Sequence, residues 1–286
     1  MKNILTIDLE EWYHANYSEG LFDNSQQYET RVVRNTEILI DLFDAYNVKA
    51  TFFTLGVIAE QFPELIRTLH ARGHEIATHG YGHQLVYKQD KREFEEDLLK
   101  SISYIEKAIG DKPIGYRAPS WSVNEDTCWV YPILKKNGIL YDSSIFPVKT
   151  FLYGFPGAPR FPFSIEFGQD EILEFPMSTI KIGNQGIPFS GGFYFRFLPY
   201  PLIKMGFRQI NRSGNPSMFY LHPREIDTEQ PRLDNLNRRD RFIHYFGLAG
   251  SQAKLEKLLA DFDFTTVKDY FFGNERLVAL PKKYIG

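Results

Sequence analysis

The sequence predicts an α/β fold built on a largely parallel sheet. Short apolar runs of strand length alternate with amphipathic stretches of helical length, and glycines follow several of the amphipathic stretches. Strands that alternate with helices are joined by crossover connections, which set the strands parallel. The chain has 286 residues, of which 43% are hydrophobic and 24% charged, so it is long enough for one large domain of this class. We expect a single domain over residues 1–286.

The regular alternation covers the first half of the chain. Residues 4–8 form an apolar run that ends in an aspartate, which predicts the first strand. Residues 31–46 repeat apolar side chains at close to helical spacing, which predicts the first helix. The same reasoning predicts strand 50–55, helix 63–72 closed by Gly73, strand 75–78, helix 94–109 closed by Gly110, a strand end at 115–117, helix 125–137 closed by Gly138, and strand 139–142.

The second half of the chain is less regular. Residues 146–162 contain four prolines and two glycines, so we expect a long irregular loop there. A segment of glycines and aromatic residues follows at 191–196, then an expected strand at 218–221 and an expected helix at 252–262. We find no internal repeat and no clear linker.

The composition limits the classes of partner and location. A formal net charge of -3 and a pI of about 6.2 give no indication of a nucleic acid or an anionic membrane as a partner. The single cysteine, Cys128, excludes an intrachain disulfide. The N-terminal apolar stretch is too short for a signal sequence, and no window approaches the roughly 20 apolar residues that span a bilayer. We therefore expect no transmembrane segment and a cytoplasmic location.

Acidic residues stand at the end of the first expected strand. On a strand, residues i and i+2 point to the same face, so Asp8 and Glu10 can converge while Glu11 points away. Two carboxylates on one face repel each other unless a cation lies between them or one is protonated. His14, four residues after Glu10, could line the same pocket.

Two histidines follow the strand at 75–78. His79 and His83 are four residues apart, and a helical turn would place both rings on one side. Two imidazoles and a carboxylate oxygen make a three-ligand site that leaves open positions for water and substrate. The spacing therefore predicts a divalent metal site.

Three further polar residues lie at expected strand ends. Pro119 biases the preceding residue toward an extended conformation, so Arg117 could be held rigidly beside a carboxylate. His222 directly follows the strand at 218–221 and suits a proton donor, and Asp142 ends another strand as a candidate pocket residue. Taken alone, each of these segments also fits a structural role. Together they suggest metal-assisted hydrolysis of an acyl bond.

As an ordered set, these segments resemble the polysaccharide deacetylase family, the NodB-homology domains of carbohydrate esterase family 4. That family carries an aspartate pair, a His-Ser/Thr-x-x-His motif, an Arg-x-Pro motif, an Asp-Ser-like segment and a Leu-His motif. The corresponding segments here are Asp8 with Glu10, 79–83, 117–119, 142–144 and 221–222. Segments 8–14, 116–120, 141–147, 191–196 and 222–232 are also similar to a branch found with bacterial exopolysaccharide and surface-glycan synthesis.

The resemblance implies a fold and a site. The fold is a distorted (β/α)7-type barrel, with a core of residues 1–224 and an irregular C-terminal extension of residues 225–286. The implied catalytic residues are the base Asp8, Arg117, which orients the base, and the general acid His222. The implied metal ligands are Glu10, His79 and His83, holding zinc or alternatively cobalt or nickel. The expected substrate contacts are His14, Pro119, Ser120, Trp121, Asp142 and Arg196.

The chain departs from the family pattern at three points. Glu10 is displaced by one residue from the position of the second aspartate, and Gly80 removes a hydroxyl that often supports the site. We find no clear equivalent of the carboxylate that tunes the acid histidine, a role that stays open for Asp142.

The implied activity is hydrolysis of the N-acetyl group of an amino sugar in a bacterial surface glycan, an exopolysaccharide or its precursor. Two other functions stay open: an allantoinase-like hydrolase of cyclic amides, and a non-catalytic glycan-binding barrel. The sequence does not distinguish a polymer from a lipid-linked oligosaccharide or a nucleotide sugar, nor does it give the oligomeric state.

Overall fold

Seven parallel strands form the wall of a distorted barrel. The computed structural model describes residues 1–14, 16, 28–150, 153–183, 185–233, 236–273 and 280–284. Within these residues the parallel strands follow the order β10-β1-β2-β3-β4-β5-β7. Their bounds are β1 Asn3–Leu9, β2 Thr51–Thr54, β3 Glu75–Thr78, β4 Gly115–Tyr116, β5 Tyr141–Asp142, β7 Asp170–Glu174 and β10 Met218–Leu221.

Further strands add to this sheet. β6 (Phe163–Phe167) runs antiparallel to β7 and pairs with β12 (Lys282–Tyr284), while β11 (Phe264–Thr265) pairs with β1. β8 (Thr179–Ile182) and β9 (Gln185–Pro188) make a separate antiparallel pair. In the described part of the chain no strand pairing joins β7 to β10, so the barrel is open on that side.

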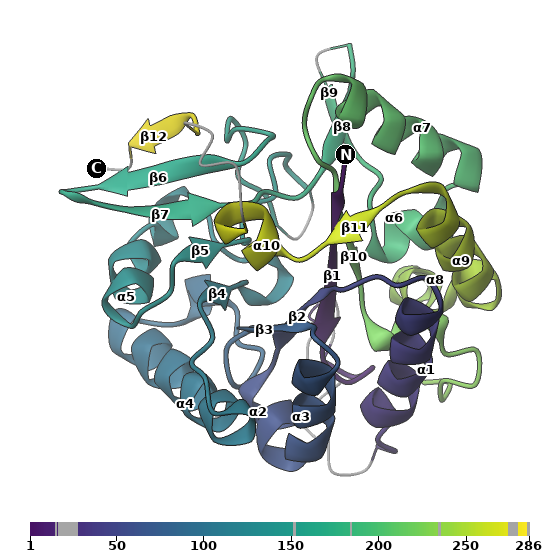
Figure 1. The fold of residues 1–286 in the computed structure, drawn as a ribbon, viewed down its shortest axis with the longest axis horizontal. Helices are drawn as coiled ribbons and strands as arrows, with labels where there is room; N and C mark the ends of the chain where they lie inside the picture. Colours follow the sequence, from purple (N-terminus) through teal and green to yellow (C-terminus); the bar gives the residue numbers. More distant parts are fainter. Residues whose placement is uncertain are drawn as a thin grey trace.

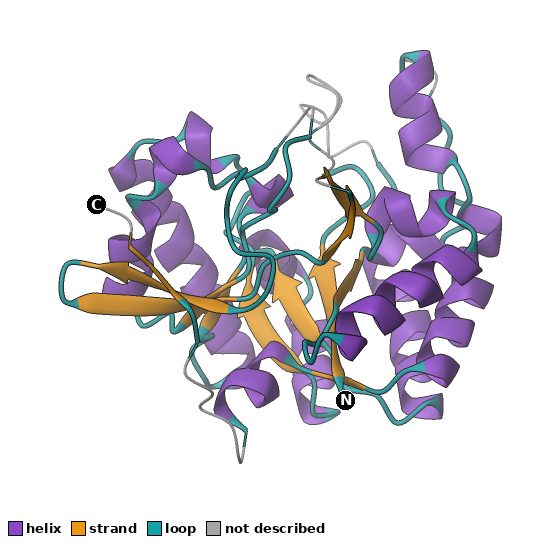
Figure 2. Ribbon diagram, turned by 90° about the horizontal axis from the view of Figure 1, so that it is seen from above, coloured by secondary structure: helices purple, strands orange, loops and turns teal. Residues whose placement is uncertain are grey.

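Helices surround the strands, as Figures 1 and 2 show. Their bounds are α1 Val32–Ala45, α2 Gly56–Gln61, α3 Pro63–Ala71, α4 Lys91–Ile109, α5 Val130–Lys136, α6 Gly192–Phe197, α7 Tyr200–Arg212, α8 Arg238–Tyr245, α9 Ser251–Asp261 and α10 Val267–Phe272. Among the described residues, no helix is both long and apolar enough to cross a bilayer.

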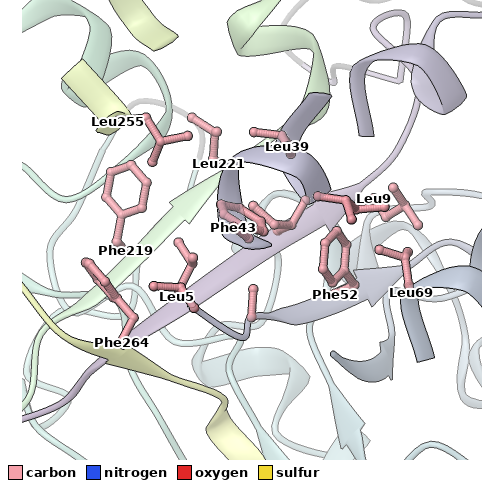
Figure 3. Close-up of a cluster of buried hydrophobic side chains, with 14 of the residues drawn as sticks. Leu5, Leu9, Leu39, Phe43, Phe52, Leu69, Phe219, Leu221, Leu255 and Phe264 are labelled. Carbon is pink, nitrogen blue, oxygen red and sulfur yellow. The ribbon is translucent and has the colours of Figure 1, made fainter. Parts of the chain in front are cut away.

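The strands alternate between an outer and an inner face, and this alternation decides which residues reach the site. On β1, Leu5 and Leu9 are fully buried in the outer core with Phe43 of α1 and Leu255 of α9 (Figure 3). Ile4 belongs instead to the inner cluster. Because side chains alternate along a strand, the even-numbered residues of β1 face the barrel interior.

The predicted α/β class, the parallel sheet and the barrel are confirmed. The predicted strands at 75–78 and 218–221 have the observed bounds of β3 and β10, and most predicted helices end within a residue or two of the observed ones. The predicted helix at 125–137 is wrong in part, because a 3-10 turn at Glu125–Thr127 precedes α5. Strands β6 to β9 were not predicted, whereas the described part of 146–162 is irregular as expected. The division into a core and an extension stays a prediction.

Candidate active site

The polar residues converge because each lies at or just beyond the carboxyl end of a parallel strand. The sheet ladder runs one residue past two strand ends: His79 N donates to Thr54 O at 2.9 Å, and Arg117 N donates to Thr78 O at 3.0 Å. Parallel strands present their carboxyl ends at the same edge, which is where the active sites of α/β barrels lie. Because side chains alternate between the two faces of each strand, those on the inner face point into the barrel.

Asp8 is held by a buried guanidinium. Arg117 Nη1 donates to Asp8 Oδ1 at 2.6 Å and to Thr6 Oγ1 at 3.0 Å. Its Nε and Nη2 donate to the carbonyl and the hydroxyl of Ser143 at 3.1 and 2.9 Å, and the guanidinium lies 4.0 Å from the ring centroid of Phe53. Both partners of the pair are buried, so the carboxylate has a fixed orientation and a fixed counter-charge.

Glu10, His79 and His83 form a group that fits a cation. One ligand atom from each lies within 4.8 Å of the other two, and all three side chains are buried. Glu10 Oε2 lies 2.7 Å from His83 Nε2, yet it is buried and accepts no hydrogen bond from the residues described. Two potential ligand atoms that face each other without a hydrogen bond match the donor set of a metal site.

Glu11 turns the other way, as the strand alternation predicts. Its carboxylate accepts the backbone N–H groups of Arg31 and Val32 at 3.1 to 3.2 Å, at the start of α1. Burial would raise the pKa of Glu10, but the neighbouring imidazoles of His83 and His222 outweigh burial and lower it. Glu10 is therefore the carboxylate available to a metal.

The two histidines are presented with suitable ring orientations. His79 Nδ1 lies 2.7 Å from the carbonyl of Arg117, which places the proton on Nδ1 and leaves Nε2 as the donor atom. Burial lowers the pKa of His79 to about 4, so the ring is neutral at pH 7, the form that binds metal.

The expected helical turn at 79–83 is wrong. Gly80 has φ 74° and His83 has φ 55°, both in the left-handed region, so a loop brings the rings to a centroid distance of 5.4 Å. Asp97 of α4 accepts the N–H groups of Tyr81 at 2.7 Å and Gly82 at 3.1 Å. A Cβ on Gly80 would lie 2.8 Å from Asp97 Oδ2, so the approach of this carboxylate to the loop requires glycine at position 80.

Asn16 joins the site without any signal in the sequence. Its Nδ2 lies 3.1 Å from His83 Nδ1 and 3.2 Å from Ser120 Oγ. An amide can present either its oxygen or its nitrogen to an imidazole, so Asn16 can orient His83 in either tautomer.

His222 is backed by a carboxylate that the sequence reasoning missed. Its Nδ1 lies 3.3 Å from Glu225 Oε2, while its Nε2 lies 3.4 Å from Glu10 Oε1 and 3.9 Å from Asp8 Oδ2. Burial would lower the pKa of His222, but the carboxylates of Glu10 and Glu225 outweigh burial and raise it. Glu225 lies within the segment 222–232, three residues after His222, and that spacing was the available signal.

Arg196 lies behind this pair rather than in the cavity. Its Nε donates to Glu225 Oε1 at 3.0 Å with both side chains fully buried. Its other nitrogens donate to the backbone carbonyls of Ile243, His244 and Phe246. The structure therefore places Arg196 as an anchor for Glu225, in contrast to the predicted substrate contact.

Asp142 also lies away from the cavity. Its Oδ1 accepts from Ser144 Oγ at 2.5 Å, and it is fully buried beside Glu174, its register partner on β7. Burial raises the pKa of Asp142 to about 6. Glu225, and not Asp142, is the carboxylate next to His222.

The remaining predicted contacts divide into lining and supporting positions. Ser120 and Trp121 line the cavity with φ values of 52° and 47°, which is strained for non-glycine residues. Pro119 starts this 3-10 turn. His14 stacks on His83 at 6.0 Å, and burial lowers the pKa of His14 to about 4.

The residues line a cavity of about 170 Å³, and five Phe, Trp and Tyr side chains form part of its wall. Trp121 packs against Tyr220 at 4.5 Å and Tyr153 at 5.4 Å between ring centroids. The lining residues are Asp8, Glu10, Asn16, His79, His83, Ser120, Trp121, Tyr153, Gly192, Phe193, Tyr194, Tyr220, His222, Arg224, Glu225 and Ile243. A second hollow of about 540 Å³ shares Trp121 and Tyr153 with it.

Two family models and several curated proteins are similar to parts of this chain. Residues 21–139 match the polysaccharide deacetylase family, and residues 143–272 match a domain of unknown function, DUF3473. The peptidoglycan deacetylase of Helicobacter pylori is 36% identical over 107 residues, which are 37% of this chain and 36% of that protein. Residues 21–139 of the chain are therefore similar to the polysaccharide deacetylase family. The chain spans about a third of the length of the curated relatives it matches.

Solved structures show the same fold across most of this chain. A Mycobacterium smegmatis protein assigned to the polysaccharide deacetylases has a TM-score of 0.62 at 21% identity, covering 93% of this chain and 87% of its own. The PuuE allantoinase has a TM-score of 0.60 at 17% identity, covering 95% of this chain and 91% of its own. At such identities the likeness establishes the barrel alone.

Proposed function

We propose that this protein is a metal-dependent N-deacetylase, acting on an amino sugar of a bacterial surface glycan, an exopolysaccharide or its precursor, in the cytoplasm. One observation carries the proposal: Asp8 paired with Arg117, and His222 paired with Glu225, share one cavity with the ligand group Glu10, His79 and His83. Relatives named as deacetylases of peptidoglycan N-acetylglucosamine and of chitooligosaccharides support an N-acetylated saccharide as substrate.

The ligand group supports a bound divalent cation such as zinc. Two imidazole nitrogens and one carboxylate oxygen would hold it and leave positions open. A cation in such a site polarises an acyl oxygen and lowers the pKa of a water from about 15.7 to about 7. The backbone carbonyl of Arg117 on His79 and the amide of Asn16 on His83 orient the two rings.

Asp8 acts as the general base. Its carboxylate accepts a proton from the water that attacks the amide carbonyl carbon. Arg117 holds Oδ1 at 2.6 Å, so Oδ2 is the oxygen left to take the proton. A fixed carboxylate loses less entropy on reaching the reactive geometry than a mobile one.

His222 acts as the general acid. The C–N bond of the tetrahedral intermediate breaks as Nε2 gives its proton to the leaving nitrogen, so the products are acetate and a free amino sugar. Glu225 on Nδ1 raises the pKa of His222 and fixes the ring. Burial would raise the pKa of Glu225, but the imidazole of His222 and the guanidinium of Arg196 outweigh it and lower it, which keeps the supporting carboxylate ionised.

Besides a bound cation, the backbone N–H of Ser120 is proposed to stabilise the developing oxyanion by a hydrogen bond. The N–H of Trp121 already donates to Ala118 O at 3.1 Å, so Ser120 is the better donor of the two. A donor held in place by a strained turn needs no reorganisation during the reaction. Trp121 and Tyr153 extend from the cavity into the larger hollow, which supports a substrate longer than a single sugar.

Acetate release by the zinc-loaded protein tests the proposal. The substrate panel would contain N-acetylated chitooligosaccharides, peptidoglycan fragments, nucleotide-linked N-acetylhexosamines and lipid-linked saccharides, with allantoin as the cyclic amide. Acetate release that is lost in Asp8→Asn supports the proposal. Hydrolysis of allantoin alone would favour a cyclic-amide hydrolase. An intact metal site with no turnover of any compound would favour a glycan-binding barrel.

A further inference from the structure

A cluster of exposed phenylalanines lies beside the mouth of the catalytic cavity. Phe197 at the end of α6, Phe242 on α8 and Phe246 just after α8 are 49%, 45% and 39% exposed. Phe193 on α6 joins them, with ring centroids 5.5 Å from Phe197 and 5.8 Å from Phe242. Phe242 and Phe246 are 4.7 Å apart. We call these four residues the aromatic face.

The aromatic face is continuous with the cavity. Phe193 and Ile243, which neighbours Phe242 in the chain, both line the cavity that contains Asp8 and His222. Figure 1 shows α6 and α8 near the end of β10 from which His222 follows. A partner that covers the aromatic face therefore lies next to the cavity that contains Asp8 and His222.

Arginines flank the aromatic face on α8. Arg238, Arg239 and Arg241 are exposed, whereas the only acidic residue of this helix, Asp240, is buried and accepts from Asn237. Positions i, i+3 and i+4 share a helix face, so Arg238 and Arg239 lie on the same side as Phe242. The helix is locally cationic although the whole chain has a net charge of -3.

We infer that the aromatic face binds an anionic membrane surface through its phenylalanines and the arginines of α8. Exposed phenylalanines can enter the boundary of the acyl chains, while arginines beside them can pair with anionic headgroups. A second copy of the chain fits less well, because a two-fold contact through this face would bring the same arginines together. The net charge of the whole chain gave no sign of this partner, because it sums over all residues and does not record the local group of arginines on α8.

Membrane binding at this position narrows the substrate class. If the proposed deacetylase activity holds, a saccharide carried on a membrane lipid would enter the cavity from the bilayer surface. The lipid-linked class is then favoured over a nucleotide sugar, and this consequence rests on the proposed function.

Co-sedimentation with vesicles tests the inference without any substrate. The protein should bind equimolar phosphatidylglycerol and phosphatidylcholine at low salt, and bind phosphatidylcholine alone at least about tenfold less, because each basic residue contributes about fivefold near an anionic surface. Phe242→Ser with Phe246→Ser should weaken binding by about tenfold or more. Arg238→Glu with Arg239→Glu should remove the preference for anionic vesicles.

Matched variants on another surface provide the control. Leu99→Ser with Leu140→Ser removes two exposed apolar side chains elsewhere on the molecule and should leave vesicle binding unchanged. Acetate release from a soluble saccharide should be the same in all these variants, so failure of the deacetylase proposal would be seen separately. Absence of vesicle binding by the unmodified protein would overturn the inference. So would a dimer in solution that Phe242→Ser with Phe246→Ser converts to monomers, because the aromatic face would then be a contact between copies.

Discussion

Glu225→Gln tests whether this carboxylate makes His222 a general acid. Glutamine keeps the shape of the side chain, and its oxygen can still accept from Arg196 Nε, which lies 3.0 Å from Glu225 Oε1. The change therefore removes the negative charge 3.3 Å from His222 Nδ1 while leaving the anchor in place.

The size of the effect follows from the loss of the charge on the hydrogen-bond partner. A hydrogen bond to a charged group contributes about 1.5–3 kcal/mol and a neutral one about 0.5–1.5 kcal/mol, so the loss is about 1–1.5 kcal/mol. At about 1.4 kcal/mol per pKa unit, the pKa of His222 should fall by about one unit. Because Glu225 raises this pKa, the alkaline limb of the kcat profile should move to lower pH by the same amount. We also expect kcat to fall by about 10- to 100-fold, the range found for hydrogen-bond partners that orient metal-ligating histidines.

Steady-state acetate release across pH, with unfolding measured in parallel, is the assay. Glu229→Gln is the matched control, because Glu229 lies in the same segment but pairs with Arg34 at the surface. An alkaline limb that stays in place in Glu225→Gln, with normal kcat, would refute the role of Glu225. A loss of stability that accounts for the lower kcat would point to a structural role instead.

Four other substitutions separate the roles of further carboxylates. Glu10→Gln should weaken zinc binding by at least about 100-fold in calorimetry. Glu11→Gln should keep the zinc affinity but lower the unfolding free energy by about 0.5–2 kcal/mol, because its carboxylate accepts N–H groups at the start of α1. Equal zinc affinities in the two variants would exclude Glu10 as a ligand. Asp8→Asn should lower turnover by about 10²- to 10⁴-fold while zinc still binds, and near-normal acetate release would contradict a base at this position. Burial and Asp142 raise the pKa of Glu174 in the folded chain, so the folded state holds a proton that the unfolded chain loses above its pKa near 4.5. The free energy of unfolding should therefore decline as pH rises, and in urea unfolding Glu174→Gln should become more stable than the unmodified protein by about 1.4 kcal/mol per pH unit until the folded pKa is passed. A stability difference that does not change with pH would refute a protonated Glu174.

Local patterns predicted much of the catalytic group because its members occupy regular positions. Asp8 and Glu10 follow the two-residue period of a strand, which distinguishes Glu10 from Glu11 without any tertiary information. His79, Arg117 and His222 each follow an apolar run, and the parallel arrangement brings such positions to one edge.

Several supporting residues could not be predicted because their partners are remote in the chain. Asp97 reaches the loop around Gly80 from the middle of α4, and Asn16 reaches Ser120 across 104 residues. Arg196 lies in a glycine-aromatic segment that suggested a substrate contact, yet the packing of α6 buries it against Glu225. A side chain's direction in an irregular segment depends on what packs around it, and no local period records that.

The alternation of strands and helices and the spacing of the carboxylates and histidines were enough to predict the α/β class and a metal site. These features repeat with the short periods of backbone geometry, so they are visible in the chain itself. The barrel, the candidate base and the candidate acid were implied by the resemblance of the ordered motifs to the polysaccharide deacetylase family. The carboxylate behind His222, the anchors of the histidine loop and the aromatic face beside the mouth emerged only when distant segments packed together. Their chemistry comes from burial and proximity, which folding creates between residues that the chain keeps far apart.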